Sequence, residues 1–343
     1  MKQHRLLELD ALRGLAALAV VFFHYFFRYN QLYGHHDLSV NWAHFGKYGV
    51  QLFFIISGFV IYWTLNRVEK PVDFLVSRFS RLYPVYWAAL VTTFCVVSYF
   101  GLPGREAHIK TAFENIIMFQ EYFFIPHVDS VYWTLTIELT FYWWVFVLYL
   151  FNQLKNVDLW LSPLVLLAVL KGVGLITIPY VIDMVFIIDY ISFFIAGICF
   201  FKIQDGIAGK ITYAILLFSL LATIASFSMN EFVLFSMFYL IFFLSVSGHF
   251  GFLKFRPFVF LGSISYSLYL IHQNIGYVVI NQFYKFAITP QYAIVFAILT
   301  SITIAVLLTR YVEKPSLQYI RKTYKNSPRI QQFAKRLTTF SSN

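Results

Sequence analysis

The first apolar segment of the chain contains two ionisable residues whose types and spacing suit chemistry. Arg13 and His24 are eleven positions apart, which places them within about 20° of one helical face and about 16 Å apart along the axis. A guanidinium binds a phosphate through two hydrogen bonds, and a neutral imidazole accepts a proton. Asp10 stands three residues before Arg13 and is expected to pair with it. The alternative for His24 is a hydrogen-bonded residue that serves packing only.

A second pair of arginines follows the second apolar segment, in the sequence RFSRLYPVYW. Arg78 and Arg81 share a helical face that would suit a diphosphate. Pro84 is expected in the first turn of the third helix, and Tyr83 beside it belongs to an interfacial aromatic cluster. The alternative is that these arginines only set the topology of the chain.

Two other apolar segments contain ionisable residues, which are costly inside a membrane and therefore candidates for function. Glu138, in WTLTIELTFY, lies about 12 Å below the outer end of its segment, and His24 lies about 8 Å below the same level. These depths would let the two meet, and a carboxylate near the imidazole would raise its basicity or act as an acid or base itself. His272 lies near mid-depth in SISYSLYLIHQN, where hydrogen bonding between helices is the alternative role.

The elements that position these residues are predicted to be membrane helices. The chain is 59% hydrophobic and 12% charged, whereas charged residues alone make up about 25% of a soluble domain. Apolar runs long enough to cross about 30 Å of hydrocarbon fall at 12–29, 46–65, 82–101, 130–151, 157–178, 183–201, 211–228, 231–250, 260–283 and 290–311. The predicted fold is therefore all-α, a polytopic membrane helix bundle of about ten transmembrane helices.

The distribution of positive charge predicts the orientation of this bundle. With an even number of helices and a cytoplasmic N-terminus, 20 of the 26 Lys and Arg residues lie on the cytoplasmic side and 6 on the other. This bias follows the positive-inside rule, so both termini are expected to be cytoplasmic. The outward loop 102–129 is expected to be a lid or a surface helix, and 321–343 a basic cytoplasmic tail that contacts water or lipid headgroups.

Other classes of protein fit the sequence poorly. The net charge is +10, but the basic residues are scattered singly between apolar runs, which argues against binding to nucleic acid. Cys95 and Cys199 both lie inside apolar runs, so no disulfide framework is indicated. No set of residues has the spacing of metal ligands, and no metal cofactor is expected.

Taken together, these motifs resemble the acyltransferase-3 family, the integral membrane O-acyltransferases of surface glycans. The resemblance spans nearly the whole chain as one domain, 1–343. It rests on LDALRGLAALAVVFFHY, FFIISGFVI, RFSRLYPVYW, WTLTIELTFY, SISYSLYLIH and the closing VEKP of 312–315. It implies that His24 is catalytic, with Arg13 as its partner, and that Arg78 and Arg81, with Tyr83 beside them, serve an acyl-CoA donor. Ser77 stands where relatives often carry another basic residue, which predicts weaker donor binding.

The resemblance also implies a reaction and a location. The enzyme would move an acyl group, by family prevalence acetyl, from cytoplasmic acetyl-CoA to a hydroxyl of a polysaccharide or lipid-linked glycan at the bacterial cytoplasmic (inner) membrane. From the predicted geometry, Glu138 is expected to assist catalysis and His272, Trp133 and Asn274 to bind the acceptor, while Glu138 or His272 would alternatively tune His24. His24 would act as a general base or carry the acyl group for a moment, and the sequence leaves both routes open, as it does the oligomeric state. The chief rival is a proton-coupled transporter, which predicts an internal repeat that we do not find. A second rival is a non-catalytic membrane partner in envelope glycan assembly.

Overall fold

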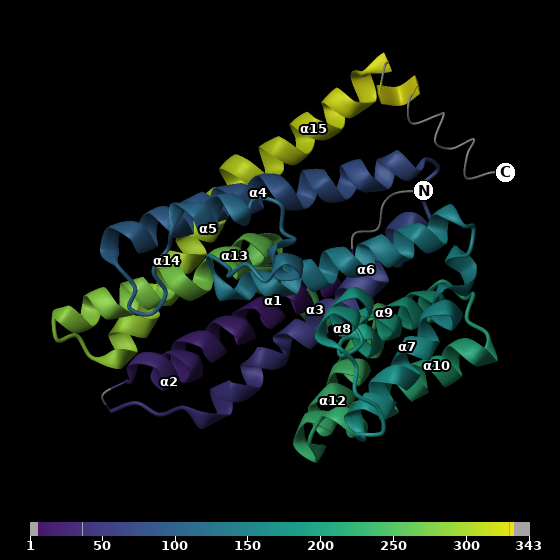
Figure 1. The fold of residues 1–343 in the computed structure, drawn as a ribbon, viewed down its shortest axis with the longest axis horizontal. Helices are drawn as coiled ribbons and strands as arrows, with labels where there is room; N and C mark the ends of the chain where they lie inside the picture. The colour runs from purple at the N-terminus through teal and green to yellow at the C-terminus, as the bar shows by residue number, and fades with distance from the viewer. Residues whose placement is uncertain (1–5, 36, 329, 333–343) are drawn as a thin grey trace.

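The computed structural model describes residues 6–35, 37–328 and 330–332, and in these the regular structure is helical throughout (Figure 1). The α-helices are α1 Leu7–Phe22, α2 Tyr29–Tyr33, α3 Gly49–Leu65, α4 Pro71–Phe100, α5 Ile109–Glu114, α6 Trp133–Leu150, α7 Val157–Gly172, α8 Tyr180–Phe186, α9 Ile191–Gln204, α10 Lys210–Leu221, α11 Thr223–Ser226, α12 Met229–Val246, α13 Arg256–Lys285, α14 Pro290–Leu308 and α15 Lys314–Asn326. The predicted all-α class is confirmed for these residues.

Several helical segments have the length and apolarity needed to cross a membrane. Seven are found among the described residues: Leu7–Tyr33, Asn41–Leu65, Pro71–Phe100, Ser130–Leu150, Tyr180–Gln204, Met229–Val246 and Pro290–Asn326. The other three predicted segments are helical but fall outside this set. The helices α7 and α10 have only 16 and 12 residues, and α13, with 30, contains many buried polar residues. The protein is thus a multi-pass helical membrane protein, whereas about ten spans remains a prediction.

The third predicted segment was placed too far along the chain. Helix α4 begins at Pro71, and Pro84 lies inside it instead of in its first turn. A proline is a good first helical residue, and Pro71 fills that position; Pro84 loses one backbone hydrogen bond, yet the helix continues through it. Arg78 and Arg81 therefore lie within a continuous helix, which holds their backbone more firmly than a helix end would.

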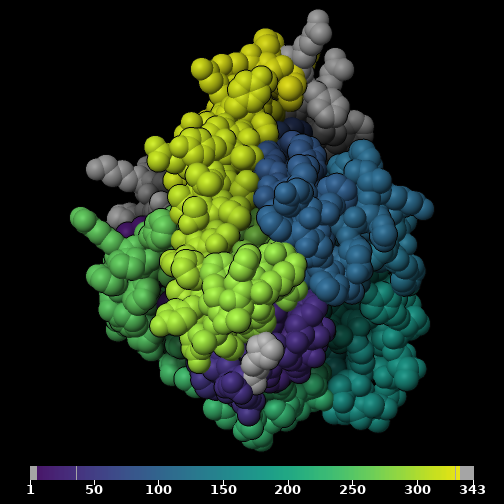
Figure 2. All heavy atoms as spheres, turned by 90° about the vertical axis from the view of Figure 1, so that its left-hand side faces the viewer, coloured from purple at the N-terminus to yellow at the C-terminus, as the bar shows by residue number. Residues whose placement is uncertain are grey.

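The helix of the tenth predicted segment extends well beyond its expected end. A π-helical turn, Thr309–Glu313, joins α14 to α15, and the helix runs on to Asn326. The space-filling view shows the C-terminal segment, in yellow, lying against α4, in blue (Figure 2). The predicted tail from 321 thus starts inside a helix that packs on the bundle, and its part 333–343 lies outside the described residues.

The helices α1 and α13 approach each other very closely. A Cβ atom on Gly14 would lie 2.4 Å from the backbone nitrogen of Gly262, and one on Gly262 would lie 2.0 Å from the carbonyl oxygen of Asp10. Only residues without a side chain allow this approach. Further along, the Tyr25 hydroxyl donates to the carbonyl oxygen of His272 at 2.6 Å and lies 2.6 Å from the Ser301 hydroxyl of α14. These contacts fix α1 against α13 at the depth of the histidines.

We expect Gly262→Ala to lower the stability of the folded protein by about 1–3 kcal/mol, because the new Cβ meets backbone atoms that have to move. The measurement is the thermal unfolding temperature of the purified protein in detergent. Gly251→Ala is the matched control, because a Cβ at Gly251 meets nothing within 4 Å. Equal unfolding temperatures for the two variants would contradict the close contact.

Candidate active site

His24 lies at the start of a π-helical turn and faces a pocket. The turn, Phe23–Arg28, follows α1 directly, and such turns are frequent at functional sites. The side chain of His24 is 9% exposed. We call this cavity of about 450 Å³ the histidine pocket; its walls are Val20, Phe23, His24, Lys47, Val50, Ser130, Val131, Trp133, Tyr269 and Gln273.

Two backbone carbonyls determine which nitrogen of each histidine carries the proton. A carbonyl oxygen only accepts, so Nδ1 of His24 donates to Val20 O at 2.9 Å and Nδ1 of His272 donates to Tyr269 O at 2.8 Å. In the neutral ring, Nε2 of His272 is then an acceptor, and it lies 3.0 Å from Nδ1 of His24. The remaining nitrogen, Nε2 of His24, keeps its lone pair and has no hydrogen-bond partner among the described residues. His24 is therefore built as a proton acceptor.

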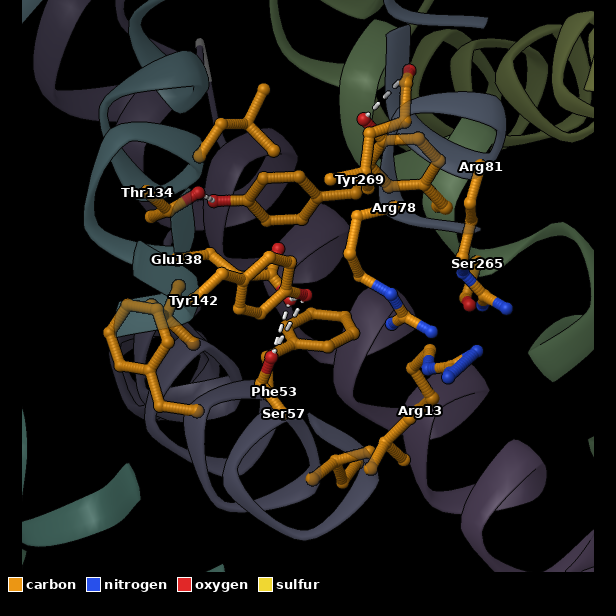
Figure 3. A pocket seen from close by; sticks show the side chains of 17 residues that line it. Arg13, Phe53, Ser57, Arg78, Arg81, Thr134, Glu138, Tyr142, Ser265 and Tyr269 are labelled. Carbon is orange, nitrogen blue, oxygen red and sulfur yellow. Dashed lines mark hydrogen bonds between the residues drawn. The ribbon is translucent and has the colours of Figure 1, made fainter. Parts of the chain in front are cut away.

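A second cavity, of about 740 Å³, collects three arginines. We call it the arginine pocket; its walls are Arg13, Val50, Phe53, Phe54, Ile56, Ser57, Val60, Arg78, Arg81, Leu82, Thr134, Leu135, Glu138, Tyr142, Ser265, Tyr266 and Tyr269. Figure 3 shows the guanidinium groups of Arg13, Arg78 and Arg81 pointing toward one another from α1 and α4. Asp10 pairs with Arg13 at 3.8 Å, as predicted. Among the described residues, neither Arg78 nor Arg81 forms an ion pair, so the pocket carries surplus positive charge suited to a phosphate.

The two pockets share a wall. Val50 and Tyr269 line both, and the Tyr269 hydroxyl lies 2.8 Å from the hydroxyl of Thr134. A long, thin ligand bound by the arginines would therefore reach His24 only past these two side chains. Arg13 and His24 thus line two adjoining pockets, one cationic and one that contains the imidazole.

Glu138 does not pair with His24. Its carboxylate accepts a hydrogen bond from Ser57 at 2.6 Å and another from Tyr142, and it lines the arginine pocket. The partner of His24 is His272 instead, because the contact between α1 and α13 brings those two helices closest at that depth. A contact between Glu138 and His24 was inferred from their depths in the membrane, and depth does not indicate which helices are neighbours.

Tyr83 also lies away from both pockets. Its hydroxyl donates to the carbonyl oxygen of Ile117 at 3.1 Å, and its ring lines an apolar cavity on the other side of Arg78. The expected role of Tyr83 in donor binding has no support from this position.

The three residues expected to bind the acceptor occupy different places. Trp133 lines the histidine pocket. His272 is 0% exposed and lies behind His24, so it can position that ring but does not line the pocket. Asn274 donates to the carbonyl oxygen of Val128 at 2.8 Å and accepts from Arg105 at 3.0 Å, which uses both of its amide atoms to hold the loop 102–129.

Three polar residues of the histidine pocket were not singled out from the sequence: Lys47, Ser130 and Gln273. Lys47 was visible only as a single basic residue at the outer end of its segment, and no motif marked it. Among the described residues, no group of three His, Cys, Asp or Glu side chains could hold a metal ion.

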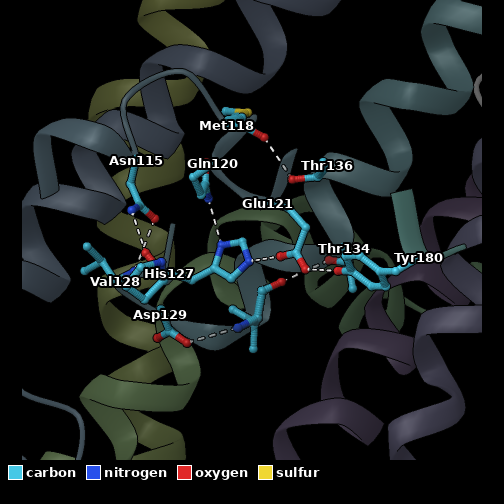
Figure 4. Close-up of polar contacts among 12 residues, drawn as sticks. Asn115, Met118, Gln120, Glu121, His127, Val128, Asp129, Thr134, Thr136 and Tyr180 are labelled. Atoms are coloured by element: carbon cyan, nitrogen blue, oxygen red, sulfur yellow. Dashed lines mark hydrogen bonds and ion pairs between the residues drawn. The ribbon is translucent and has the colours of Figure 1, made fainter. Parts of the chain in front are cut away.

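The loop 102–129 contains the surface helix α5 and is tied down by a polar cluster (Figure 4). Gln120 donates to Nδ1 of His127 at 2.8 Å, and Nε2 of His127 contacts the Glu121 carboxylate. The Tyr180 hydroxyl also donates to Glu121, at 2.5 Å. Burial alone would raise the pKa of Glu121, but the hydrogen bonds from Tyr180 and His127 outweigh it and hold the pKa below its ordinary value.

A buried carboxylate joins this loop to α13. Asp129 accepts from the backbone N–H of Asn274 at 3.0 Å and of Val131 at 3.3 Å. Burial raises the pKa of Asp129 to about 6, although these hydrogen bonds act in the opposite direction. The loop is thus anchored two residues from His272, and it ends directly before Ser130, which lines the histidine pocket.

Fold and site together define a multi-pass helical membrane protein in which a cationic pocket adjoins a histidine pocket. The acyltransferase-3 family model, described as an acyltransferase domain, matches residues 6–310, and the chain belongs to this family. The resemblance drawn from the motifs is confirmed.

Several curated proteins are similar to the chain. The peptidoglycan O-acetyltransferase OatA of Listeria monocytogenes is 28% identical over 191 residues, which is 50% of this chain and 28% of that protein. The exopolysaccharide production protein ExoZ of Rhizobium meliloti is 33% identical over 109 residues, 28% of this chain and 32% of that protein. The chain thus covers only about a third or less of these relatives. No solved structure matches it significantly.

We expect Glu121→Gln to loosen the loop 102–129, because the neutral amide loses the charge-assisted hydrogen bonds to His127 and Tyr180. The measurement is hydrogen exchange of the loop amides at pH 7, which should be faster than in the wild type. Glu114→Gln is the matched control, since Glu114 forms only a surface pair with Lys110. Because the pKa of Glu121 is lowered by folding, its contribution should persist above about pH 4.3 and disappear as the pH falls further. Unchanged exchange would contradict the anchor.

Proposed function

We propose that this protein is a membrane O-acyltransferase that moves an acetyl group from acetyl-CoA to a hydroxyl of a carbohydrate. The family match and the O-acetyltransferase relatives support the activity. The observation that carries it is the lone pair of Nε2 of His24, which faces one pocket while three arginines gather in the adjoining one. A proton acceptor next to a phosphate-binding pocket suits transfer from a thioester of CoA.

The donor is proposed to enter from the arginine pocket. With about ten spans and both termini cytoplasmic, this pocket opens toward the cytoplasm of a bacterial cell, where acetyl-CoA is made. The guanidinium groups of Arg13, Arg78 and Arg81 bind its phosphates, and the thin pantetheine arm extends past Val50 and Tyr269. The thioester then lies beside His24.

In the proposed transfer step, His24 acts as a general base. Nε2 takes the proton of the acceptor hydroxyl as its oxygen attacks the thioester carbonyl carbon, and the negative charge on the carbonyl oxygen is stabilised by the nearby ammonium of Lys47. The tetrahedral intermediate then collapses, the C–S bond breaks, and the CoA thiolate takes the proton from Nε2. His272 shares the Nδ1–H hydrogen bond of His24 with the Val20 carbonyl oxygen throughout and is a positioning residue.

The acceptor is proposed to reach His24 from the opposite end of the histidine pocket. Trp133 lines both this pocket and a neighbouring cavity that contains Tyr180 and Tyr190. Aromatic rings with polar neighbours suit the apolar faces and hydroxyls of a sugar. The names of OatA and ExoZ, which refer to peptidoglycan and exopolysaccharide, support a polysaccharide or lipid-linked glycan as the acceptor. The transporter alternative has no support from the family or the relatives.

We expect His24→Ala to lower acceptor-dependent release of CoA by a factor of about 10² to 10⁴, because the variant has no proton acceptor in the pocket. The measurement uses purified protein, acetyl-CoA and a glycan extract from the native envelope. His249→Ala, a change at an exposed histidine, should retain full activity. If folded wild-type protein releases no CoA from acetyl-, succinyl- or longer acyl-CoA, the proposed function is wrong.

We expect His272→Phe to lower kcat roughly 10- to 100-fold and to leave KM for both substrates nearly unchanged. The phenyl ring keeps the volume but cannot accept the hydrogen bond from Nδ1 of His24, so the base loses its fixed orientation. Steady-state kinetics measure the effect, with His249→Phe as the control. A large rise in the acceptor KM instead would show that His272 binds the acceptor.

A further inference from the structure

The helix α15 lies outside the region matched by the family, which ends at residue 310, and it packs along α4 (Figure 2). Two polar contacts hold it there, and a third holds the residues that follow it. Arg321 donates to the Ser77 hydroxyl at 3.0 Å, Tyr324 donates to Asp73, and Lys70 donates to Gln331 at 2.9 Å. Val72 and Tyr324 add a small buried apolar contact. These contacts hold α15 next to the arginine-bearing face of α4.

Arg321 joins the arginines that α4 already presents. The Ser77 hydroxyl accepts from Arg321 at 3.0 Å and also lies 3.5 Å from Nη2 of Arg78. Arg81 is close enough for its charge to repel that of Arg321. Two guanidinium groups thus meet at one hydroxyl, with a third nearby.

In the described part of the chain, the carboxylate that lines the arginine pocket, Glu138, forms no ion pair with this cluster of positive charge. Among the described residues, Arg78, Arg81 and Arg321 form no ion pair with a carboxylate. The Nε atoms of Arg78 and Arg321 are buried without a hydrogen-bond partner. Buried donors in native proteins are nearly always paired, and like charges are not gathered without a reason. An anion with several oxygen atoms would satisfy both requirements.

We propose that Arg321 of α15 is a donor-binding residue that, together with Arg78 and Arg81, binds the phosphate groups of acyl-CoA. This inference rests on the proposed function. CoA carries a diphosphate and a 3′-phosphate, so it supplies enough oxygen atoms for several guanidinium groups at once. A phosphate of a lipid headgroup has the same chemistry, and the experiment separates the two sources.

The test compares donors with and without phosphate groups. Thiol release is measured for the wild type, Arg321→Ala, Arg321→Lys and Lys325→Ala with acetyl-CoA and with S-acetylpantetheine, which lacks the phosphates. For acetyl-CoA we expect Arg321→Ala to raise KM about tenfold or more and to leave kcat nearly unchanged, and Arg321→Lys to recover part of the loss. Lys325→Ala removes an exposed charge from the same helix and should change KM less than twofold. With S-acetylpantetheine, Arg321→Ala and the wild type should have the same KM.

Three results would overturn the inference. The first is an equal KM for acetyl-CoA in Arg321→Ala and the wild type. The second is an equal defect with both donors, which would indicate a structural role for Arg321. The third is a defect that appears in nanodiscs containing phosphatidylglycerol but not in pure phosphatidylcholine, which would assign the residue to lipid binding.

A CoA-binding measurement distinguishes failure of the proposed function from failure of this inference. If the wild type released no thiol at all, CoA binding would be measured by the shift it causes in the unfolding temperature. Arg321→Ala should then need about tenfold more CoA for the same shift, and an equal response to CoA would overturn the inference.

Discussion

The candidate site depends on the close packing of α1 against α13. Gly14 and Gly262 let the two backbones approach so closely that a Cβ atom at either position would collide with the other helix. This approach brings His24 and His272 within one hydrogen bond of each other. Because each imidazole also donates to a carbonyl of its own helix, the backbone itself fixes the proton positions. A change in helix spacing would therefore alter the chemistry of His24 without altering any pocket residue.

The two pockets differ in how the protein compensates their buried polar and charged groups. The imidazoles of His24 and His272 form hydrogen bonds only with neutral groups, which keeps the cost of burying them small. The arginine pocket, by contrast, gathers three arginines, of which only Arg13 forms an ion pair, with Asp10, among the described residues. Their mutual repulsion in a medium of low dielectric is a cost of the unliganded state, and a bound phosphate relieves it. The binding free energy of the donor is thus concentrated at its phosphate end, away from the bond that breaks.

The sequence predicts features that depend on neighbouring residues within one helix. The helical segments, the pairing of Asp10 with Arg13 and the shared face of Arg78 and Arg81 all follow from spacing. Contacts between helices do not follow in this way. His24 and His272 are separated by most of the chain, and no spacing rule indicates that their helices touch.

Other differences have specific physical causes. Pro84 looked like a helix start because its local sequence suits one, yet Pro71 is an equally good start and the tertiary packing of α4 favours the longer helix. At Ser77 the sequence alone predicted a weaker donor site. In the structure, Arg321 of α15 donates to the Ser77 hydroxyl. A helix remote in the sequence therefore supplies a positive charge at the position where α4 has none.

Helix α13 contributes both Tyr269, in the wall between the two pockets, and His272, which orients His24. Tyr269 separates the pockets, and His272, one turn later on α13, donates to the carbonyl oxygen of Tyr269. The Tyr269 ring also packs edge-on against Phe53 of α3, with ring centroids 5.5 Å apart. A ligand that displaces the Tyr269 side chain to pass between the pockets leaves this backbone hydrogen bond in place. In the proposed reaction, movement of the Tyr269 side chain would widen the passage between it and Val50, while His272, and through it His24, keeps the orientation that proton transfer requires.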